Sequence, residues 1–148
     1  ILPDVLQRML AEPFFAERPP KSTGRDLFNL DWLEQHLSGK ESPTDVQATL
    51  LALTGDSIAD AVRRFCPGTA ELYLCGGGAH NSALKSHLQR KLPQCEIKLT
   101  DALGIPADWM EAIAFAWLAR QAMHLRPGNL PAVTGAAHPC VLGSIYPA

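Results

Sequence analysis

The stretch LYLCGGGAHNSALKSHL, residues 72–88, decides the fold of this chain. An apolar run suited to a buried strand leads into three consecutive glycines, and a helical pattern with Leu84 and Leu88 on one face follows. Glycine loses more conformational entropy on folding than any other residue, so such a run is kept where backbone takes unusual angles or lies close to something. The stretch therefore predicts a strand-to-helix turn that meets either packed backbone or a ligand.

The flanking sequence extends this turn into a β-α-β unit. A second short apolar run, CEIKL at residues 95–99, follows the helix, as in parallel strands joined by a crossover helix. Long helical patterns lie at residues 43–65, with Gly55 placed for close packing, and from Pro106 onward. The latter helix is apolar all round at its centre and is expected to be buried. These patterns predict an α/β fold with several helices packed on a small central sheet.

Length and composition predict one globular domain. The chain has 148 residues, 47% hydrophobic and 19% charged, enough to bury a sizeable core. The formal net charge is -2 and the basic residues are scattered, which argues against nucleic acid as a partner. The longest apolar run, residues 112–119, is too short to span a bilayer, and no signal pattern opens the chain. We therefore expect no membrane partner and a cytoplasmic location.

The glycine turn is the first candidate for a ligand site. A strand, a glycine turn and a helix point backbone N–H groups and the positive end of a helix dipole at an anion, which suits a phosphate or a nucleotide. The spacing departs from G-x-G-x-x-G, because Asn81 stands where the third glycine would be. A tight, closely packed turn explains the same pattern, and Asn81 either caps the helix or offers its amide to a ligand.

The stretch PPKSTGR, residues 19–25, is a second candidate. Lys21, Ser22, Thr23 and Arg25 supply the ammonium, hydroxyl and guanidinium groups that bind phosphate, carboxylate or sugar oxygens. A solvated polar loop is the alternative interpretation.

Carboxylates and histidines give weaker signals. Glu111 leads into the apolar helix, where its carboxylate either interacts favourably with the positive end of the helix dipole or faces a solvent-filled cleft. Asp101 is ambiguous between turn former and site residue. Among the histidines only His80, beside the glycines, is a candidate, and neither a metal-binding spacing nor a catalytic nucleophile motif is present. We therefore nominate no catalytic residue and no metal ligand in this chain.

Three stretches in a fixed order carry a family resemblance. They are PPKSTGRDLFN at residues 19–29, LYLCGGGAHN at residues 72–81 and DALGIPADWMEAIAFAWLA at residues 101–119. Together they resemble the C-terminal half of bacterial anhydro-N-acetylmuramic acid kinase over essentially the whole chain. The resemblance implies an RNase H-like lobe of the sugar kinase, actin and heat-shock chaperone ATPase superfamily, in which two lobes close on a central cleft.

The resemblance also implies an activity and its ligands. The family uses ATP and Mg2+ to open the 1,6-anhydro ring of anhydro-N-acetylmuramic acid with water and to phosphorylate O6, giving N-acetylmuramic acid 6-phosphate for cell-wall (peptidoglycan) recycling. Gly76, Gly77, Gly78 and Asn81 match the family's nucleotide-binding turn. Glu111 matches an acidic residue expected to contact the sugar.

Other expectations concern the parts of the enzyme around this chain. The match of KSTGR places Lys21, Ser22, Thr23 and Arg25 on the cleft side of the sugar pocket. The family's GTSxDGxD motif and its general base, an aspartate of the N-terminal lobe, have no counterpart in this sequence. The start at Ile1 within a helical pattern also suggests a piece of a longer protein. We therefore expect residues 1–148 to be a C-terminal lobe that is inactive alone.

The sequence leaves the oligomeric state open, a homodimer included, and three other interpretations stand beside the kinase. Another actin-like sugar or acid kinase would share the glycines and differ around Glu111. A non-catalytic module would bind nucleotide or a protein partner without turnover. A Rossmann-type dehydrogenase is disfavoured by Asn81 and by the late position of the glycines.

Overall fold

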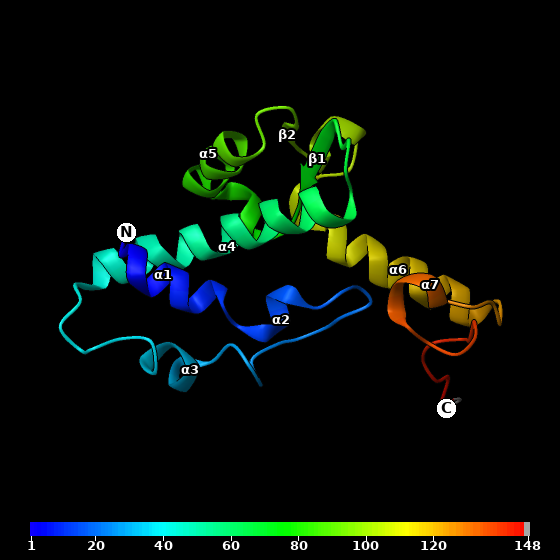
Figure 1. Cartoon of the computed structure of the whole chain (residues 1–148). Helices are drawn as coiled ribbons and strands as arrows, with labels where there is room; N and C mark the ends of the chain where they lie inside the picture. Colours follow the sequence, from blue (N-terminus) through cyan, green and yellow to red (C-terminus); the bar gives the residue numbers. More distant parts are fainter. Residues whose placement is uncertain (147–148) are drawn as a thin grey trace.

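The computed structural model describes residues 1–146 of the chain. Figure 1 shows the long helix α4 between a small sheet with α5 on one side and short helices on the other, while α6 leads away to the C-terminal segment. In chain order the elements are α1 (Pro3–Leu10), α2 (Pro13–Ala16), α3 (Leu30–Glu34), α4 (Pro43–Phe65), β1 (Glu71–Leu74), η1 (Gly77–His80), α5 (Ser82–Lys91), β2 (Glu96–Leu99), η2 (Thr100–Leu103), η3 (Ala107–Trp109), α6 (Met110–Met123) and α7 (Pro131–Thr134), where η denotes a 3-10 helix.

Helix α4 is the axis on which the other elements pack. Its start is fixed by Ser42, whose Oγ accepts a hydrogen bond from the Asp45 N–H at 3.1 Å, and by Pro43 at the first helical position. An acidic residue in its first turn and basic residues in its last turn suit the helix dipole. The helix predicted over residues 43–65 is confirmed.

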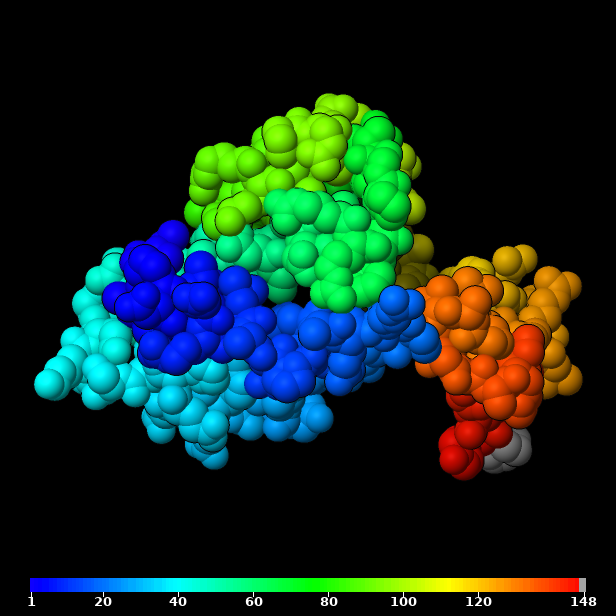
Figure 2. Space-filling model, viewed as in Figure 1, coloured from blue at the N-terminus to red at the C-terminus, as the bar shows by residue number. Residues whose placement is uncertain are grey.

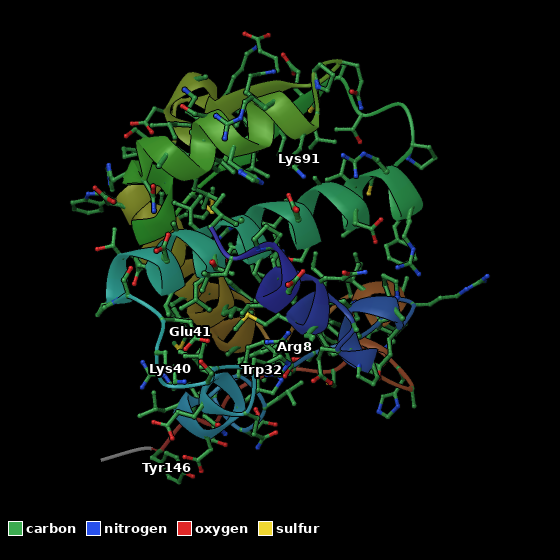
Figure 3. The ribbon with its side chains drawn as sticks, turned by 60° about the vertical axis from the view of Figure 1, so that its left-hand side comes forward. Arg8, Trp32, Lys40, Glu41, Lys91 and Tyr146 are labelled. Atoms are coloured by element: carbon green, nitrogen blue, oxygen red, sulfur yellow. The ribbon has the colours of Figure 1, made fainter. Side chains whose placement is uncertain are left out.

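One face of α4 packs against α5 and the sheet. The buried residues of this first core cluster are Ala59, Leu88, Leu92, Cys95 and Ile97. The two helices approach most closely at Gly55, because the imidazole of His87 occupies the space that a side chain at residue 55 would need. Asp56 holds that imidazole, with its Oδ1 2.7 Å from His87 Nε2, and Lys91, labelled in Figure 3, donates to Asp56 Oδ2 at 3.0 Å. The prediction that Gly55 permits close packing is confirmed.

Strands β1 and β2 form a parallel two-stranded sheet with α5 as the crossover. The register pairs Glu71 with Glu96 and Leu74 with Leu99. The ammonium of Lys98 bridges the two carboxylates, at 2.6 Å from Glu71 Oε1 and 2.9 Å from Glu96 Oε2, and these hydrogen bonds raise its pKa. The predicted β-α-β unit is confirmed, and the carboxyl ends of both strands meet at one edge of the sheet.

The opposite face of α4 packs against the N-terminal helices. The buried residues of this second core cluster are Val5, Met9, Trp32 and Leu53. Trp32 Nε1 donates to Glu12 Oε2 at 2.9 Å, and Arg8 Nη2 donates to the His36 carbonyl at 2.8 Å, which holds α3 close to α1 (Figure 3). The α/β class is as predicted, but these helices pack on α4 and not on a central sheet. A sheet of two strands offers too little surface for them, whereas α4 is apolar on two faces.

Helix α6 differs from the prediction. Its apolar centre predicts a buried helix, yet none of its residues is buried, and Phe115 and Trp117 are 70% and 47% exposed. The reason is that residues 1–146 cover it only in part: the segment 142–145 lies beside Leu118 and Ala122, while the first half of the helix is exposed. The helix has 14 residues, and no helix in the described part of the chain is long and apolar enough to cross a membrane.

The approach of α4 to α5 gives a test of the core. Gly55→Ala is expected to lower the free energy of unfolding by about 1–3 kcal/mol, because the new methyl group collides with the His87 imidazole. Chemical denaturation measures the loss. In a His87→Ala background the same substitution has no partner to collide with, so we expect it to be neutral or stabilising. A gain of about 1 kcal/mol in the original background, the amount that helix propensity alone supplies, would contradict this packing.

Candidate functional site

The loops that follow the two parallel strands meet at the carboxyl edge of the sheet. One loop is the glycine turn, residues 75–81, and the other runs from Thr100 to Trp109 through η2 and η3. The N–H of Gly76 donates to the Ala107 carbonyl at 2.9 Å, which ties the two loops together. Ligands of open α/β sheets bind beyond the carboxyl ends of their strands, so this edge is the place where a site is expected.

Gly76 differs from the other two glycines of the turn in its backbone conformation. Gly76 has φ 71° and ψ −175°, a backbone conformation open in practice only to glycine. At Gly77 and Gly78 the added Cβ atom of a larger residue would meet no protein atom within 4 Å. Backbone conformation therefore explains Gly76, and the space in front of all three glycines is open within the described chain. The closely packed turn that the sequence offered as an alternative therefore fits none of the three glycines.

Asn81 caps α5. Its Oδ1 accepts a hydrogen bond from the Leu84 N–H at 3.0 Å, which is the capping role that the sequence offered as one of two. The cap places the first turn of α5 directly behind the glycine turn. The backbone N–H groups that begin a helix have no acceptor within it, and with the helix dipole they favour an anion at this end.

A hydrogen-bonded pair joins the glycine turn to the second loop. His80 Nε2 lies 2.6 Å from Asp108 Oδ1, and Asp101 Oδ2 accepts the Ala107 N–H at 3.2 Å. The hydrogen bond and the charge of Asp108 raise the pKa of His80. The charged pair is therefore present at low pH and is lost as the pH rises through that raised pKa. The sequence singled out His80 and Asp101 but missed the pairing with Asp108, since 28 residues separate the partners.

Glu111 lies in the first turn of α6, directly after η3. Its side chain is exposed and makes no hydrogen bond or ion pair with another residue in the range 1–146. Because η3 contacts the glycine turn through Asp108, the start of α6 that carries Glu111 lies near the turn. Its position suits contact with a ligand at the sheet edge, and it suits equally the helix dipole.

The PPKSTGR stretch lies elsewhere, against α7. Lys21 Nζ donates to the carbonyls of Phe14 and Phe15 at 2.6 and 3.3 Å, so its ammonium caps the end of α2. Ser22, Thr23 and Arg25 are exposed. Figure 2 shows this blue segment touching the orange one that contains α7.

Residues of both segments line a pocket of about 380 Å³, namely Pro20, Lys21, Ser22, Val133 and Thr134. Gly135 has φ 74°, and a Cβ atom there would lie 3.0 Å from Pro20 Cγ, so the two segments pack closely. Two groups of predicted residues therefore exist, the glycine turn with Glu111 and the PPKSTGR stretch with α7. Helix α6 runs between them (Figure 1).

The fold and the turn define a class of protein: an α/β protein with a glycine-rich strand-to-helix turn at the carboxyl edge of a parallel sheet. The model of the family described as anhydro-N-acetylmuramic acid kinase matches residues 1–148. The chain belongs to this family.

Individual relatives agree with the family match. Over 148 residues the chain is 57% identical to a protein named anhydro-N-acetylmuramic acid kinase from Nitrosomonas europaea, covering 100% of this chain and 41% of the relative. Proteins of the same name from Nitrosospira multiformis and Ralstonia nicotianae are 55% and 56% identical, each over 97% of this chain and over 39% and 38% of their own lengths. The chain thus spans about 40% of these relatives.

The glycines can be separated by their effect on stability. Gly76→Ala is expected to lower the free energy of unfolding by about 1–3 kcal/mol, because alanine is strained at a φ of 71°. Gly77→Ala and Gly78→Ala are the matched controls, expected to stay within about 0.5 kcal/mol, since the added methyl groups enter open space. Urea denaturation compares the three. Equal losses at all positions would contradict the geometry of the turn.

Proposed function

We propose that this chain is the C-terminal, RNase H-like lobe of an ATP-dependent anhydro-N-acetylmuramic acid kinase. The observation that carries the proposal is the open space in front of Gly77 and Gly78, at a turn whose chain matches that family over its whole length. Glycines that pack against nothing allow a ligand to come within contact distance of the backbone. The role of the chain is to supply the adenosine side of the nucleotide site and part of the sugar pocket.

The nucleotide side consists of Gly76, Gly77, Gly78 and Asn81. Gly76 sets the direction of the backbone, and Gly77 and Gly78 leave the surface bare. Asn81 contributes indirectly: its Oδ1 accepts the Leu84 N–H and so fixes the start of α5 directly after the glycine turn. The open surface of the turn suits the adenosine part of ATP, while the helix end behind it favours the negative charge of the phosphates.

The sugar side is assigned to Glu111 and to the KSTGR loop, which lie apart from each other within the described chain. A carboxylate accepts hydrogen bonds from sugar hydroxyl or amide groups, and Glu111 has no partner among residues 1–146 that would compete for it. Ser22, Thr23 and Arg25 present donors on an exposed loop. Lys21 acts by holding this loop to α2, through its hydrogen bonds to Phe14 and Phe15.

The reaction is hydrolysis of the anhydro ring coupled to phosphoryl transfer. Water attacks the anomeric carbon, the bond from that carbon to O6 breaks, and O6 takes the γ-phosphoryl group as ADP leaves. The base that removes the proton from water is assigned to the N-terminal lobe, because this chain offers no candidate within its own motifs. Residues of this chain bind and orient the two substrates, which is the main source of rate in phosphoryl transfer.

Mg2+ is implied by the family but is not assigned to residues of this chain. Within residues 1–146 no group of three His, Cys, Asp or Glu side chains is placed to hold a metal ion. A magnesium ion bound with ATP takes most of its ligands from phosphate oxygens and water. No step of the proposal runs through protein ligands to the metal.

The exposed helix α6 is the surface that the rest of the kinase covers. Ile113, Phe115 and Trp117 are 42%, 70% and 47% exposed, an apolar area that a soluble domain normally buries. The chain spans about 40% of its relatives, so the larger part of the family protein is the natural partner for this face. Closure of the two lobes over the turn and Glu111 then excludes water that would compete with O6. A homodimer is compatible with the same proposal. We place the enzyme in the cytoplasm.

The test uses a chimera that joins this chain to the part of the Nitrosomonas europaea relative that it does not span. We expect the chimera to form N-acetylmuramic acid 6-phosphate from the anhydro sugar and Mg-ATP, and the isolated chain to form none. Gly77→Val is expected to raise KM for ATP by about 100-fold, and Glu111→Gln to raise KM for the sugar by about 10-fold to 100-fold. Product is followed by mass spectrometry.

Ser86→Val is the matched control, because it adds the same branched side chain at an exposed position on α5 away from the turn. Its KM values should equal those of the chimera. Unchanged KM for ATP in Gly77→Val would contradict the nucleotide assignment. Turnover by the isolated chain would contradict the assignment of the general base to the N-terminal lobe.

A further inference from the structure

The contact between His80 and Asp108 has no role in the proposed binding of either substrate. It joins the turn assigned to the nucleotide with the loop that leads into α6, at 2.6 Å between His80 Nε2 and Asp108 Oδ1. A second link between the same loops is the 2.9 Å hydrogen bond from the Gly76 N–H to the Ala107 carbonyl. The two links lie at adjacent residues of η3, so the glycine turn and η3 are held at two points.

We propose that the His80–Asp108 hydrogen bond is a positioning contact that couples nucleotide binding at the glycine turn to sugar binding at Glu111. The inference rests on the proposed function and adds the route by which the two half-sites communicate. Neither residue contacts a substrate in this scheme. Their role is to fix η3, and with it the start of α6, relative to the turn.

The chain geometry makes such coupling direct. Asp108 precedes Glu111 by three residues, and helical backbone advances only about 1.5–2 Å per residue, so a shift of Asp108 is passed to the Glu111 carboxylate. Asp101, in η2, accepts the Ala107 N–H at 3.2 Å and fixes the same segment. A ligand that orders the turn therefore orders the loop that carries Glu111, and the reverse holds by linkage.

Because His80 and Asp108 are exposed, their effect on ligand coupling can be measured separately from any effect on folding stability. The side chains of His80 and Asp108 are 59% and 63% exposed. Ion pairs so open to water contribute little to folding stability. Their removal is therefore expected to leave the fold intact, and a change in ligand coupling can be measured without loss of the protein.

The charges that face His80 predict how the coupling depends on pH. Asp108 in η3 and Asp101 in η2 are the carboxylates that act on it, and both favour the imidazolium. The pKa of His80 is therefore raised, first by its hydrogen bond to the Asp108 carboxylate and then by the charge of that carboxylate. The charged form of the contact is complete below the ordinary pKa of histidine and is lost as the pH rises through the raised value. The coupling should weaken over that range.

The experiment is a thermodynamic cycle in the chimera with β,γ-imido-ATP and the anhydro sugar as probes. Isothermal titration calorimetry gives the Kd of the sugar with and without saturating nucleotide analogue. In the starting chimera we expect bound analogue to tighten the sugar by about fivefold or more. In His80→Ala and Asp108→Ala this factor should fall to about 1 while each probe alone still binds. His80→Gln should retain part of it, because its amide can still donate to Asp108.

Asp60→Ala is the matched control, since it breaks the exposed Arg64–Asp60 pair on α4. Its coupling factor should equal that of the starting chimera. Far-UV circular dichroism reports the fold, and Asp108→Asn, of nearly the same shape, replaces any variant that does not fold. In Asp108→Asn the NMR titration of the His80 imidazole should move to lower pH.

The outcomes distinguish this inference from the proposed function. Independent binding of the two probes in the starting chimera, or an undiminished factor in both alanine variants, would overturn the inference and leave the kinase assignment standing. Failure of the starting chimera to bind either probe or form product would overturn the proposed function, and the inference with it.

Discussion

The close approach of α4 to α5 at Gly55 is the constraint on which the rest of the structure depends. Because residue 55 has no side chain, the His87 imidazole fits against α4 and reaches the carboxylate of Asp56. Burial alone would raise the pKa of the Asp56 carboxyl. Hydrogen bonds from Lys91 and His87 keep its pKa low. Helix α5 is thereby fixed, and with it both parallel strands and the glycine turn at its N-terminal end.

The site follows from where the parallel strands end. Two loops leave the same edge of the sheet, one with three glycines and one that leads into α6, and they are joined at Gly76 and at His80. Open space in front of Gly77 and Gly78 leaves the turn accessible to another molecule. Membership of the anhydro-N-acetylmuramic acid kinase family supplies the identity of that molecule in our proposal. In the same proposal, exposed α6 is the surface that the rest of the enzyme covers.

Local patterns predicted what depends on neighbours in the sequence. The helix over residues 43–65, the β-α-β unit and the cap at Asn81 follow from periodicity and capping chemistry, and all three are confirmed. The prediction that α6 is buried was wrong, because the sequence pattern shows that a helix is apolar but not which part of a protein covers it. The pairing of His80 with Asp108 depends on the meeting of two loops in space, which no local pattern contains.

The central claim is that the nucleotide meets this chain at the glycine turn. Hydrogen–deuterium exchange of the chimera, with and without β,γ-imido-ATP, tests it most directly, because protection is read along the whole chain at once. We predict slower exchange of the backbone amides in residues 75–81, extending to residues 107–111 through the joined loop. Protection confined to other segments, with the turn unchanged in a chimera that forms product, would contradict the account.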